Sequence, residues 1–516
     1  MVELPARDQL IGLDVGTTSC KAGLFDRRGR LLAQASAAYP VARPQPGWIE
    51  QAVDDYWQAA VQCLRALLAA PAADRRRLAA LSSCGQTPTM VLLDEHGAPV
   101  RPAILWQDTR AAAEAEALAR DPGTAVLAEW MGLRWPVDAS LPLARLLWLR
   151  RHEPHALART RITLQPKDYV HLRLTGRAAT DVWSAKGLVH QGTRRPAAAL
   201  CAMAGVALDL IPEALLPTAV LGRVTAAAAQ ETGLPEGLPV VAGWTDGMAA
   251  MLGTGAFGVP GIAADVSGTS EVVGITLPAQ PATPGPLLAA PIVDTGRWVL
   301  YGPTQASGAA LGWALQVLRS PASDAAAEER PPESSEMAIG SGAWLGAVAA
   351  VPAGAEGLLF LPYLEGERAP LWDPHARGAL IGLRTTHSTA HVLRAVLEGV
   401  ACSVRHVLAA AEAHGGGRAR EVRVAGGGAR LSLWNQIKAD VAGRPFVPCR
   451  VTENGVLGAA ILAATGVGLY PSVTAAGEAM VQLDAPVLPT AEHQTTYDRL
   501  FQRYTALYPR LRDLLA

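Results

Sequence analysis

Pro239-Val240-Val241-Ala242-Gly243-Trp244-Thr245-Asp246-Gly247 is the stretch that decides the fold. It begins as an apolar run, breaks at the turn and gives way to Met248-Ala249-Ala250-Met251-Leu252, which predicts a buried strand, a tight turn and a helix start. Asp246 should lie on that turn. A carboxylate at the carboxyl end of a buried strand faces a crevice and suits a general base. The alternative is that Asp246 only caps the helix, which Asp does well.

A second turn follows within residues 262–273, where a β-rich run is interrupted by Ser267-Gly268-Thr269-Ser270. This pattern predicts a hairpin whose backbone amides can cradle a phosphate. An ordinary hairpin turn would contain similar residues, so this stretch leaves both interpretations open.

Residues 10–26 repeat the same order of features near the N-terminus: an apolar strand, Asp14-Val15, the turn Gly16-Thr17-Thr18-Ser19 and a second strand. Self-similarity at a separation of about 250 residues suggests two related domains, each beginning with a hairpin. In the first hairpin, Asp14 can hold a magnesium ion, Thr17 and Thr18 offer groups that fit phosphate oxygens, and Lys21 adds a cation. Gly, Thr and Ser are also common in turns that bind no ligand, so an ordinary turn is the alternative.

The composition agrees with two domains and a small-molecule partner. The chain has 516 residues, of which 50% are hydrophobic and 18% charged, and 516 residues exceed the size at which one core stops growing. Its net charge of -1 indicates no excess of positive charge that would attract a polyanion, so we expect no nucleic-acid partner.

Cysteine usage and the N-terminal residues bear on the cell compartment. The six cysteines are scattered, which favours buried thiols in a reducing compartment. Residues 1–8 lack an apolar signal core, so we expect a cytoplasmic protein. The most membrane-like window, residues 344–364, contains prolines, a glutamate and glycines, so we expect no membrane partner.

Polar side chains follow two predicted strands of the first half. Residues 78–81 form a short strand that leads to Gln86 and Thr87, and residues 103–106 form another that ends at Trp106 and Asp108. Hydrogen-bonding groups beside a flat aromatic face are what a sugar site requires. Equally, Asp108 can merely cap the helix that follows.

The second half contains two glycine-rich turns before helices. Residues 302–308 lead into a helix at 309–318, and Gly426-Gly427-Gly428 separates a strand at 421–425 from a helix at 429–441. Glycines there let the backbone approach an adenine or a phosphate. Residues 320–337 have almost no core-forming residue and predict an exposed loop.

With these pieces placed, the chain resembles the FGGY carbohydrate kinase family of the sugar kinase, actin and Hsp70 superfamily. The resemblance covers almost the whole chain and depends on the order and spacing of many short motifs. These motifs are residues 14–21, 47–51, 106–110, 246, 267–270, 377–383 with His387, 394–399, 426–429 and Asp440.

The resemblance implies an α/β fold of two ribonuclease-H-like (actin-like ATPase) domains with a cleft between them. The sugar would bind mainly to an N-terminal domain at residues 1–246 and ATP mainly to a C-terminal domain at 247–480. Residues 481–516 would form a helical segment that packs back on the body.

The resemblance also assigns roles to individual residues, with ATP and Mg²⁺ as cofactors. Asp246 would be the base that takes the proton of the attacking hydroxyl, and Asp14 would help to hold Mg²⁺. The groups near the nucleotide would be Thr17, Thr18, Lys21, Gly268, Thr269, Gly308, Gly427, Gly428 and Ser432. The groups near the sugar would be Gln86, Thr87, Trp106 and Asp108, together with Asp246.

The loop at residues 86–89 and the residue after the expected base depart from the family's patterns. Xylulokinase-like members carry Gln-Met-His-Gly where this chain has Gln86-Thr87-Pro88-Thr89, and glycerol kinases carry Arg-Glu after the Gln. Xylulokinases usually place Asn after the base, where this chain has Gly247. We therefore expect a xylulokinase-like enzyme acting on a pentulose, with a gluconate- or polyol-type kinase as the alternative. An alternative from a different class of protein is an actin- or Hsp70-like ATPase or ligand sensor. The sequence also leaves open whether the chain forms a homodimer.

Overall fold

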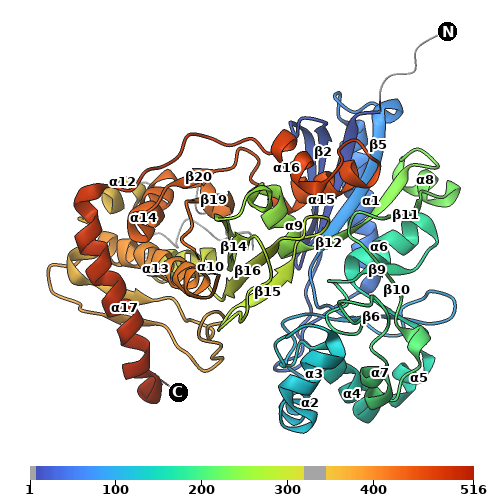
Figure 1. Cartoon of the computed structure of the whole chain (residues 1–516), viewed down its shortest axis with the longest axis horizontal. Helices are drawn as coiled ribbons and strands as arrows, with labels where there is room; N and C mark the ends of the chain where they lie inside the picture. Colours follow the sequence, from blue (N-terminus) through green and yellow to red (C-terminus); the bar gives the residue numbers. More distant parts are fainter. Residues whose placement is uncertain (1–6, 319–343, 416, 516) are drawn as a thin grey trace, which may run out of the picture. The chain divides into compact units, whose positions relative to one another are not determined.

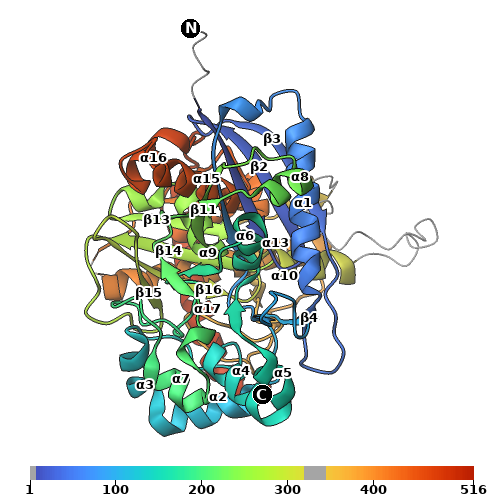
Figure 2. The ribbon, with the colours of Figure 1, turned by 90° about the vertical axis from the view of Figure 1, so that its right-hand side faces the viewer.

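The structure, a computed structural model, describes residues 7–318, 344–415 and 417–515. The chain divides into two compact units (Figures 1 and 2). Unit 1 comprises Met1–Gly253 and Gly455–Met480, and unit 2 comprises Thr254–Asn454 and Val481–Ala516. The expected loop at residues 320–337 lies outside the described residues.

Unit 1 is built on a six-stranded sheet in the order β11-β12-β5-β1-β2-β3. Its strands are β1 (Gln9–Val15), β2 (Ser19–Asp26), β3 (Leu31–Ala38), β5 (Leu78–Gly85), β11 (Val220–Arg223) and β12 (Pro239–Thr245). β1, β2 and β3 form an antiparallel meander, while β5 runs parallel to β1 and β12 runs parallel to β5. Three parallel strands therefore end at one edge of the sheet.

Different helices cover the two faces of this sheet. Successive residues of a strand point to opposite faces, so the residues of β1 contact both sets of helices. Ile11, Leu13 and Val15 belong to the core that contains α1 (Val53–Ala69) and α6 (Pro166–Thr175). Gly12 faces the opposite way, and a Cβ atom there would lie 2.0 Å from the Val456 carbonyl oxygen of α15 (Asn454–Gly466). Small residues thus let α15 lie directly on the strands.

The remaining elements of unit 1 are short and connect the strands; many gather below the sheet in Figure 1. The helices are α2 (Ala112–Leu118), α3 (Thr124–Met131), α4 (Pro142–His152), α5 (Pro154–Arg159), α7 (Ala198–Ala204), α8 (Ala226–Thr232), α9 (Asp246–Gly253) and α16 (Val473–Met480). The short strands are β4 (Glu50–Gln51), β6 (Val91–Leu93), β7 (Ala103–Ile104), β8 (Ile162–Leu164), β9 (Ala179–Asp181) and β10 (Glu213–Leu215).

Unit 2 contains a second six-stranded sheet, in the order β15-β16-β14-β13-β19-β20. Its strands are β13 (Ile262–Ser267), β14 (Glu271–Leu277), β15 (Leu288–Pro291), β16 (Trp298–Thr304), β19 (Glu421–Gly426) and β20 (Phe446–Pro448). β13, β14 and β16 form an antiparallel meander, and β19 and β20 continue the sheet in parallel from β13. The strands β13, β14, β16, β19 and β20 are thus connected in the same way as β1, β2, β3, β5 and β12 of unit 1.

A long helix, α13 (Thr389–Gly415), organises the rest of unit 2 by packing on β14, β16 and the neighbouring helices. The other elements are α10 (Gly308–Val317), α12 (Trp344–Ala349), β17 (Leu359–Leu361), β18 (Ala379–Ile381), α14 (Ser432–Ala442) and α17 (Gln494–Leu515). α17 packs on α13, α14 and β17.

The expectation of an α/β fold with two related domains is confirmed by the shared strand connectivity of the two sheets. The expectation of buried, unpaired thiols is also confirmed, since all six cysteines are free and buried. The two compact units divide the chain differently from the expected domains: residues 247–253 and 455–480, which we placed in the C-terminal domain, cluster with unit 1. Among the described residues, no helix is both long enough and apolar enough to cross a membrane.

Candidate active site

The carboxyl ends of β1, β5 and β12 bring two carboxylates to one edge of the unit 1 sheet. Asp14 of β1 pairs with Cys84 of β5, and Cys84 pairs on its other side with Trp244, two residues before Asp246. Two strand spacings put the strands that carry Asp14 and Asp246 about 10 Å apart. Burial and the negative charges of Asp14 and Asp246 raise the pKa of the Cys84 thiol, which lies between them.

Asp246 opens α9 directly after β12, as the apolar run and turn predict. Its Oδ1 accepts a hydrogen bond of 2.7 Å from the Gly247 N–H. The Thr245 hydroxyl accepts a 3.4 Å bond from the Met248 N–H, so Thr245 shares the capping of the first turn. Asp246 is half-buried at the strand end.

A bulge in β12 sets the direction of this strand end. The register between β12 and β5 shifts between Val241 and Trp244, and Gly243 lies inside the shift at a φ of 72°. A Cβ atom at Gly243 would come within 1.7 Å of the Ser83 carbonyl oxygen. Only glycine combines this left-handed conformation with such a close approach, and the bulge re-aims the residues that follow.

The first hairpin places Asp14 opposite Lys21, which is its register partner on β2. A Cβ atom at Gly455 of α15 would lie 3.1 Å from Asp14 Oδ2, so the helix start approaches the carboxylate closely. At the turn, Thr17 is half-buried and Thr18 is exposed. Asp14, Thr17, Thr18 and Lys21 thus share one end of the hairpin.

Gln86 links the loop after β5 to the first hairpin. Its side-chain amide donates to the Gly16 carbonyl at 3.1 Å and to Gln51 Oε1 at 3.0 Å, while its Oε1 accepts from the Thr89 hydroxyl at 3.0 Å. Gln86 is almost fully buried. These contacts favour a role in holding the loop in place over direct contact with a sugar.

Thr87 and Trp106 are more open. Thr87 is half-buried and donates to the Ser184 carbonyl at 3.4 Å, and the Trp106 indole donates to the Thr17 hydroxyl at 3.0 Å. The indole therefore ties the expected sugar loop to the expected phosphate turn.

Asp108 is fully engaged by protein donors. Its Oδ2 accepts from the Ile49 N–H at 2.6 Å, and Arg110 binds both carboxylate oxygens. Asp108 is 1% exposed, and these contacts favour a structural role over sugar binding. That role differs from the expected helix cap, because the N-cap of α2 is Ala111 and has no side-chain cap bond.

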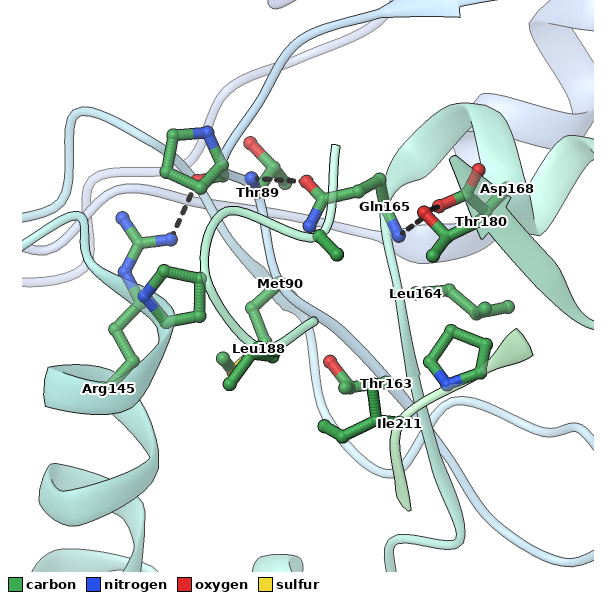
Figure 3. Close-up of a pocket in the computed structure, with 14 residues that line it drawn as sticks. Thr89, Met90, Arg145, Thr163, Leu164, Gln165, Asp168, Thr180, Leu188 and Ile211 are labelled. Carbon is green, nitrogen blue, oxygen red and sulfur yellow. Dashed lines mark hydrogen bonds between the residues drawn. The ribbon is translucent and has the colours of Figure 1, made fainter. Parts of the chain in front are cut away.

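A small cavity lies behind the 86–89 loop, among the side chains drawn in Figure 3. Gln165 Oε1 accepts from the Thr89 N–H at 2.9 Å, and Asp168 Oδ2 accepts from the Gln165 N–H at 3.2 Å. The cavity measures about 20 Å³, which is room for one water molecule and too small for a sugar.

Sequence reasoning missed Lys186, which follows β9 on a turn with a φ of 43°. Its ammonium lies 4.5 Å from the centroid of the Trp135 ring. Burial lowers the pKa of Lys186 to about 8, although the charges of Asp246, Asp181 and Asp138 partly oppose this shift. A compositional signal was present, since the chain has only 4 lysines against 41 arginines.

In unit 2, the second hairpin turn packs against the start of α10. The Gly308 N–H donates to the Gly268 carbonyl at 3.0 Å, and the Ser307 N–H donates to the Thr269 carbonyl at 3.0 Å. A Cβ atom at Gly308 would lie 2.7 Å from the Gly268 oxygen. The structure thus brings together Gly268, Thr269 and Gly308, and the turn residues Gly268 and Thr269 are exposed.

A buried ionic cluster, also missed from the sequence, supports this hairpin. Lys438 of α14 donates to Asp265 Oδ2 at 2.8 Å, to the Ser267 hydroxyl at 2.6 Å and to Glu271. Burial and the charge of Glu271 raise the pKa of Asp265. The cluster fixes both strands at the base of the turn.

The triple glycine joins β19 to α14. Gly426 has a φ of 83°, and a Cβ atom at Gly428 would lie 2.7 Å from the Ser267 Cβ. Close packing against β13 therefore accounts for Gly428 without a ligand. Gly427 is half-buried and Ser432, at the start of α14, is exposed.

These donor sets fit the cofactors that the sequence suggests. Carboxylate oxygens such as those of Asp14 are the ligands that Mg²⁺ prefers. Among the described residues no group of three or more His, Cys, Asp or Glu side chains could hold a metal, so an ion at Asp14 would take other ligands from water and phosphate. The exposed hydroxyls of Thr269 and Ser432 are accessible to a nucleotide.

The chain belongs to the FGGY family of carbohydrate kinases. It matches the family's N-terminal domain over residues 9–253 and its C-terminal domain over residues 263–467. It is a phosphotransferase that uses ATP and acts on a small-molecule sugar, which favours the kinase over the actin- or Hsp70-like ATPase. The recognised family and the fold expected from it are confirmed.

Individual relatives are similar along their whole length. The xylulose kinase of Bacillus subtilis (strain 168) is 29% identical over 98% of this chain and 97% of its own. The crystal structure of xylulose kinase from Rhodospirillum rubrum has a TM-score of 0.84 at 31% identity, covering 98% of this chain and 99% of that one. Gluconate kinase from Lactobacillus acidophilus has a TM-score of 0.85 at 25% identity, with 98% of both chains covered.

Proposed function

We propose that the enzyme phosphorylates a hydroxyl of an open-chain sugar, with Asp246 as the base that accepts the hydroxyl proton. The observation that carries this proposal is the placement of Asp246 at the end of β12, two strands from Asp14. A base must lie within hydrogen-bond reach of the proton it takes, and a strand end held by a bulge keeps it in place.

Asp14 is the proposed protein ligand of Mg²⁺, which when bound would neutralise charge on the transferred phosphoryl group. Thr17, Thr18 and Lys21 share the end of the same hairpin and are proposed to border the phosphates. In unit 2, the proposed nucleotide groups are Gly268, Thr269, Gly308, Gly427, Gly428 and Ser432. Phosphoryl transfer has a loose transition state and depends mainly on alignment and charge, which is what these groups supply.

The first acceptor class is a pentulose such as D-xylulose. Support comes from the similarity to two xylulose kinases along the full length of the chain. Thr87 and Trp106 are the proposed acceptor contacts, while Gln86 and Asp108 are proposed to hold them in place through their buried contacts.

A sugar acid is the second acceptor class. Lys186 favours it, since this cation lies beside the 86–89 loop and its charged form is favoured most strongly by Asp246. The similarity to a gluconate kinase of known structure agrees with this alternative.

A coupled assay of ADP release over ketopentoses, aldonates and polyols tests the proposal. We expect stimulation by at least one acceptor and no comparable ADP release without one. ADP release that no acceptor on the panel stimulates would contradict the proposed reaction.

A further inference from the structure

Unit 1 contains a cation that takes no part in the proposed proton and phosphoryl transfers. Lys186 is half-buried, and its ammonium lies over the face of Trp135, 4.5 Å from the ring centroid. Among the described residues, Lys186 has no hydrogen bond through its side chain and no carboxylate within the 4 Å of an ion pair. A partly buried charge that lacks a direct counter-ion costs free energy unless a ligand supplies one.

The turn that carries Lys186 is held rigidly. Asp181 Oδ1 accepts from the Trp183 and Ser184 N–H groups at 2.9 and 3.0 Å, and Lys167 forms an ion pair with Asp181 at 3.0 Å. The backbone of Lys186 has a φ of 43°, a value that residues other than glycine rarely adopt. Backbone strain of this kind is concentrated at functional positions.

This turn adjoins the groups proposed to hold the acceptor. The Thr87 hydroxyl donates to the Ser184 carbonyl, two residues before Lys186. Of the three carboxylates that favour the charged lysine, Asp246 acts most strongly, ahead of Asp181 and Asp138. Lys186 therefore follows closely on the residue that binds the acceptor loop, and the charge of the proposed base acts on its ammonium.

The surroundings of Lys186 contain hydrogen-bond donors that no described group satisfies. Trp135 Nε1, Trp183 Nε1 and the Ser184 hydroxyl are buried and have no hydrogen-bond partner in the described part of the chain. Trp135 and Trp183 contact each other, with 4.7 Å between ring centroids. Ammonium and indole N–H groups only donate, so the complementary ligand group is one whose oxygens only accept.

We propose that Lys186 binds the carboxylate of a sugar acid and makes the enzyme prefer that acid to the neutral polyol with the same carbon chain. A carboxylate supplies both the accepting oxygens and the missing negative charge, whereas a hydroxyl supplies no charge. Lys186 would also offset the repulsion between this carboxylate and Asp246. The inference rests on the proposed kinase function and specifies its acceptor.

Matched acceptor pairs isolate the carboxylate. D-gluconate differs from D-glucitol, and D-xylonate from xylitol, in having a carboxylate where the polyol has a primary alcohol. Binding of each compound to the full-length protein is measured by calorimetry without ATP, and turnover is measured by ADP release. The variants are Lys186→Met, Lys186→Arg and, as a control, Arg195→Gln, which removes an exposed positive charge from the loop that follows.

The wild type should bind at least one acid about tenfold or more tightly than its matched polyol. Lys186→Met should abolish this preference, Lys186→Arg should keep part of it, and Arg195→Gln should leave it unchanged. Thermal unfolding of each variant shows whether it is folded.

The preference should also depend on pH. Carboxylate binding requires the protonated ammonium, which is present below the Lys186 pKa of about 8. Affinity for the acid should therefore fall as the pH rises above that value, while affinity for the polyol should not. Asp246, Asp181 and Asp138 are the charged groups that act on the ammonium.

Three results would overturn the proposal. The first is a wild type with no preference for either acid, and the second is a Lys186→Met variant that retains the preference. The third is an equal loss of turnover on acids and polyols in Lys186→Met with a shifted pH–rate profile, which would mean that Lys186 acts through Asp246.

The test also separates this inference from the kinase function. Phosphorylation of xylulose without acid binding would reject the carboxylate site alone. Lys186-dependent acid binding without phosphorylation of any acceptor would reject the proposed reaction alone.

Discussion

Asp246 is positioned by the backbone around it. Its Oδ1 accepts from the Gly247 N–H, and the Thr245 hydroxyl accepts from the Met248 N–H, so the first turn of α9 fixes the side chain. Asparagine can accept the same bond from Gly247, but it cannot accept the proton of a hydroxyl.

We expect Asp246→Asn to lower kcat by roughly 10²-fold or more, because it removes the proton acceptor and little else. The dissociation constant for ATP should stay close to the wild-type value. Steady-state kinetics and nucleotide binding check this, with Asp209→Asn as the control at an exposed position. Full activity in Asp246→Asn would rule out Asp246 as the base.

At the scale of elements, the bulge of β12 directs the strand end that carries Asp246. Gly243 and Gly237 have similar φ angles of 72° and 78°, but their surroundings differ. A Cβ atom at Gly243 would meet the Ser83 carbonyl oxygen at 1.7 Å, while one at Gly237 would meet nothing within 4 Å.

Gly237→Ala should therefore cost about 1 kcal/mol, the penalty of a left-handed alanine. Gly243→Ala should cost about 3 kcal/mol or more, because the clash also forces β12 away from β5. Urea unfolding of both variants measures the difference. Equal costs would show that the close approach to Ser83 does not matter.

At the same scale, the loop at residues 86–89 after β5 and Gly247, which follows the proposed base, are the positions that we expect to govern the choice of acceptor. Thr87 contacts the Ser184 carbonyl, and a side chain at Gly247 would meet no atom within 4 Å of its Cβ. A larger residue thus has space at position 247.

The triple variant Thr87→Met, Pro88→His and Gly247→Asn should raise activity on D-xylulose relative to the other acceptors. Buried hydrogen bonds to hydroxyls can discriminate by several kcal/mol, because a mismatch leaves a polar group unpaired. The Michaelis constant for ATP should change little. An acceptor profile equal to the parent's would place specificity elsewhere, with Trp106 and Lys186 as the next positions to test.

At the scale of the whole molecule, unit 1 is made of two separated pieces of chain. Gly12 of β1 and Gly458 of α15 mark the contact: their Cβ atoms would lie 2.0 Å from the Val456 oxygen and 1.9 Å from the Ala249 oxygen, respectively. One face of the sheet therefore depends on residues 455–480 for its cover.

We expect residues 1–253 alone to expose this face and to bind a hydrophobic dye without a cooperative unfolding transition. Joining residues 455–480 to them through a flexible linker of about 15 residues should restore cooperative unfolding in urea, because such a linker spans about 20 Å. Joining residues 494–515 instead is the control, since α17 belongs to unit 2. Cooperative unfolding of residues 1–253 alone would contradict this view.

The sequence by itself determined the two hairpins, the strand before Asp246 and the order of the family motifs, because these features depend on local periodicity and turn chemistry. Only the tertiary structure decided which polar groups are already engaged. Asp108 and Gln86 have the residue types of a sugar site, yet partners far along the chain occupy their side chains. Lys186 and Lys438 gave no local signal, because their importance comes from carboxylates and aromatic rings that folding brings to them. The place of residues 455–480 in unit 1 likewise depends on packing between segments about 440 positions apart, which no local pattern encodes.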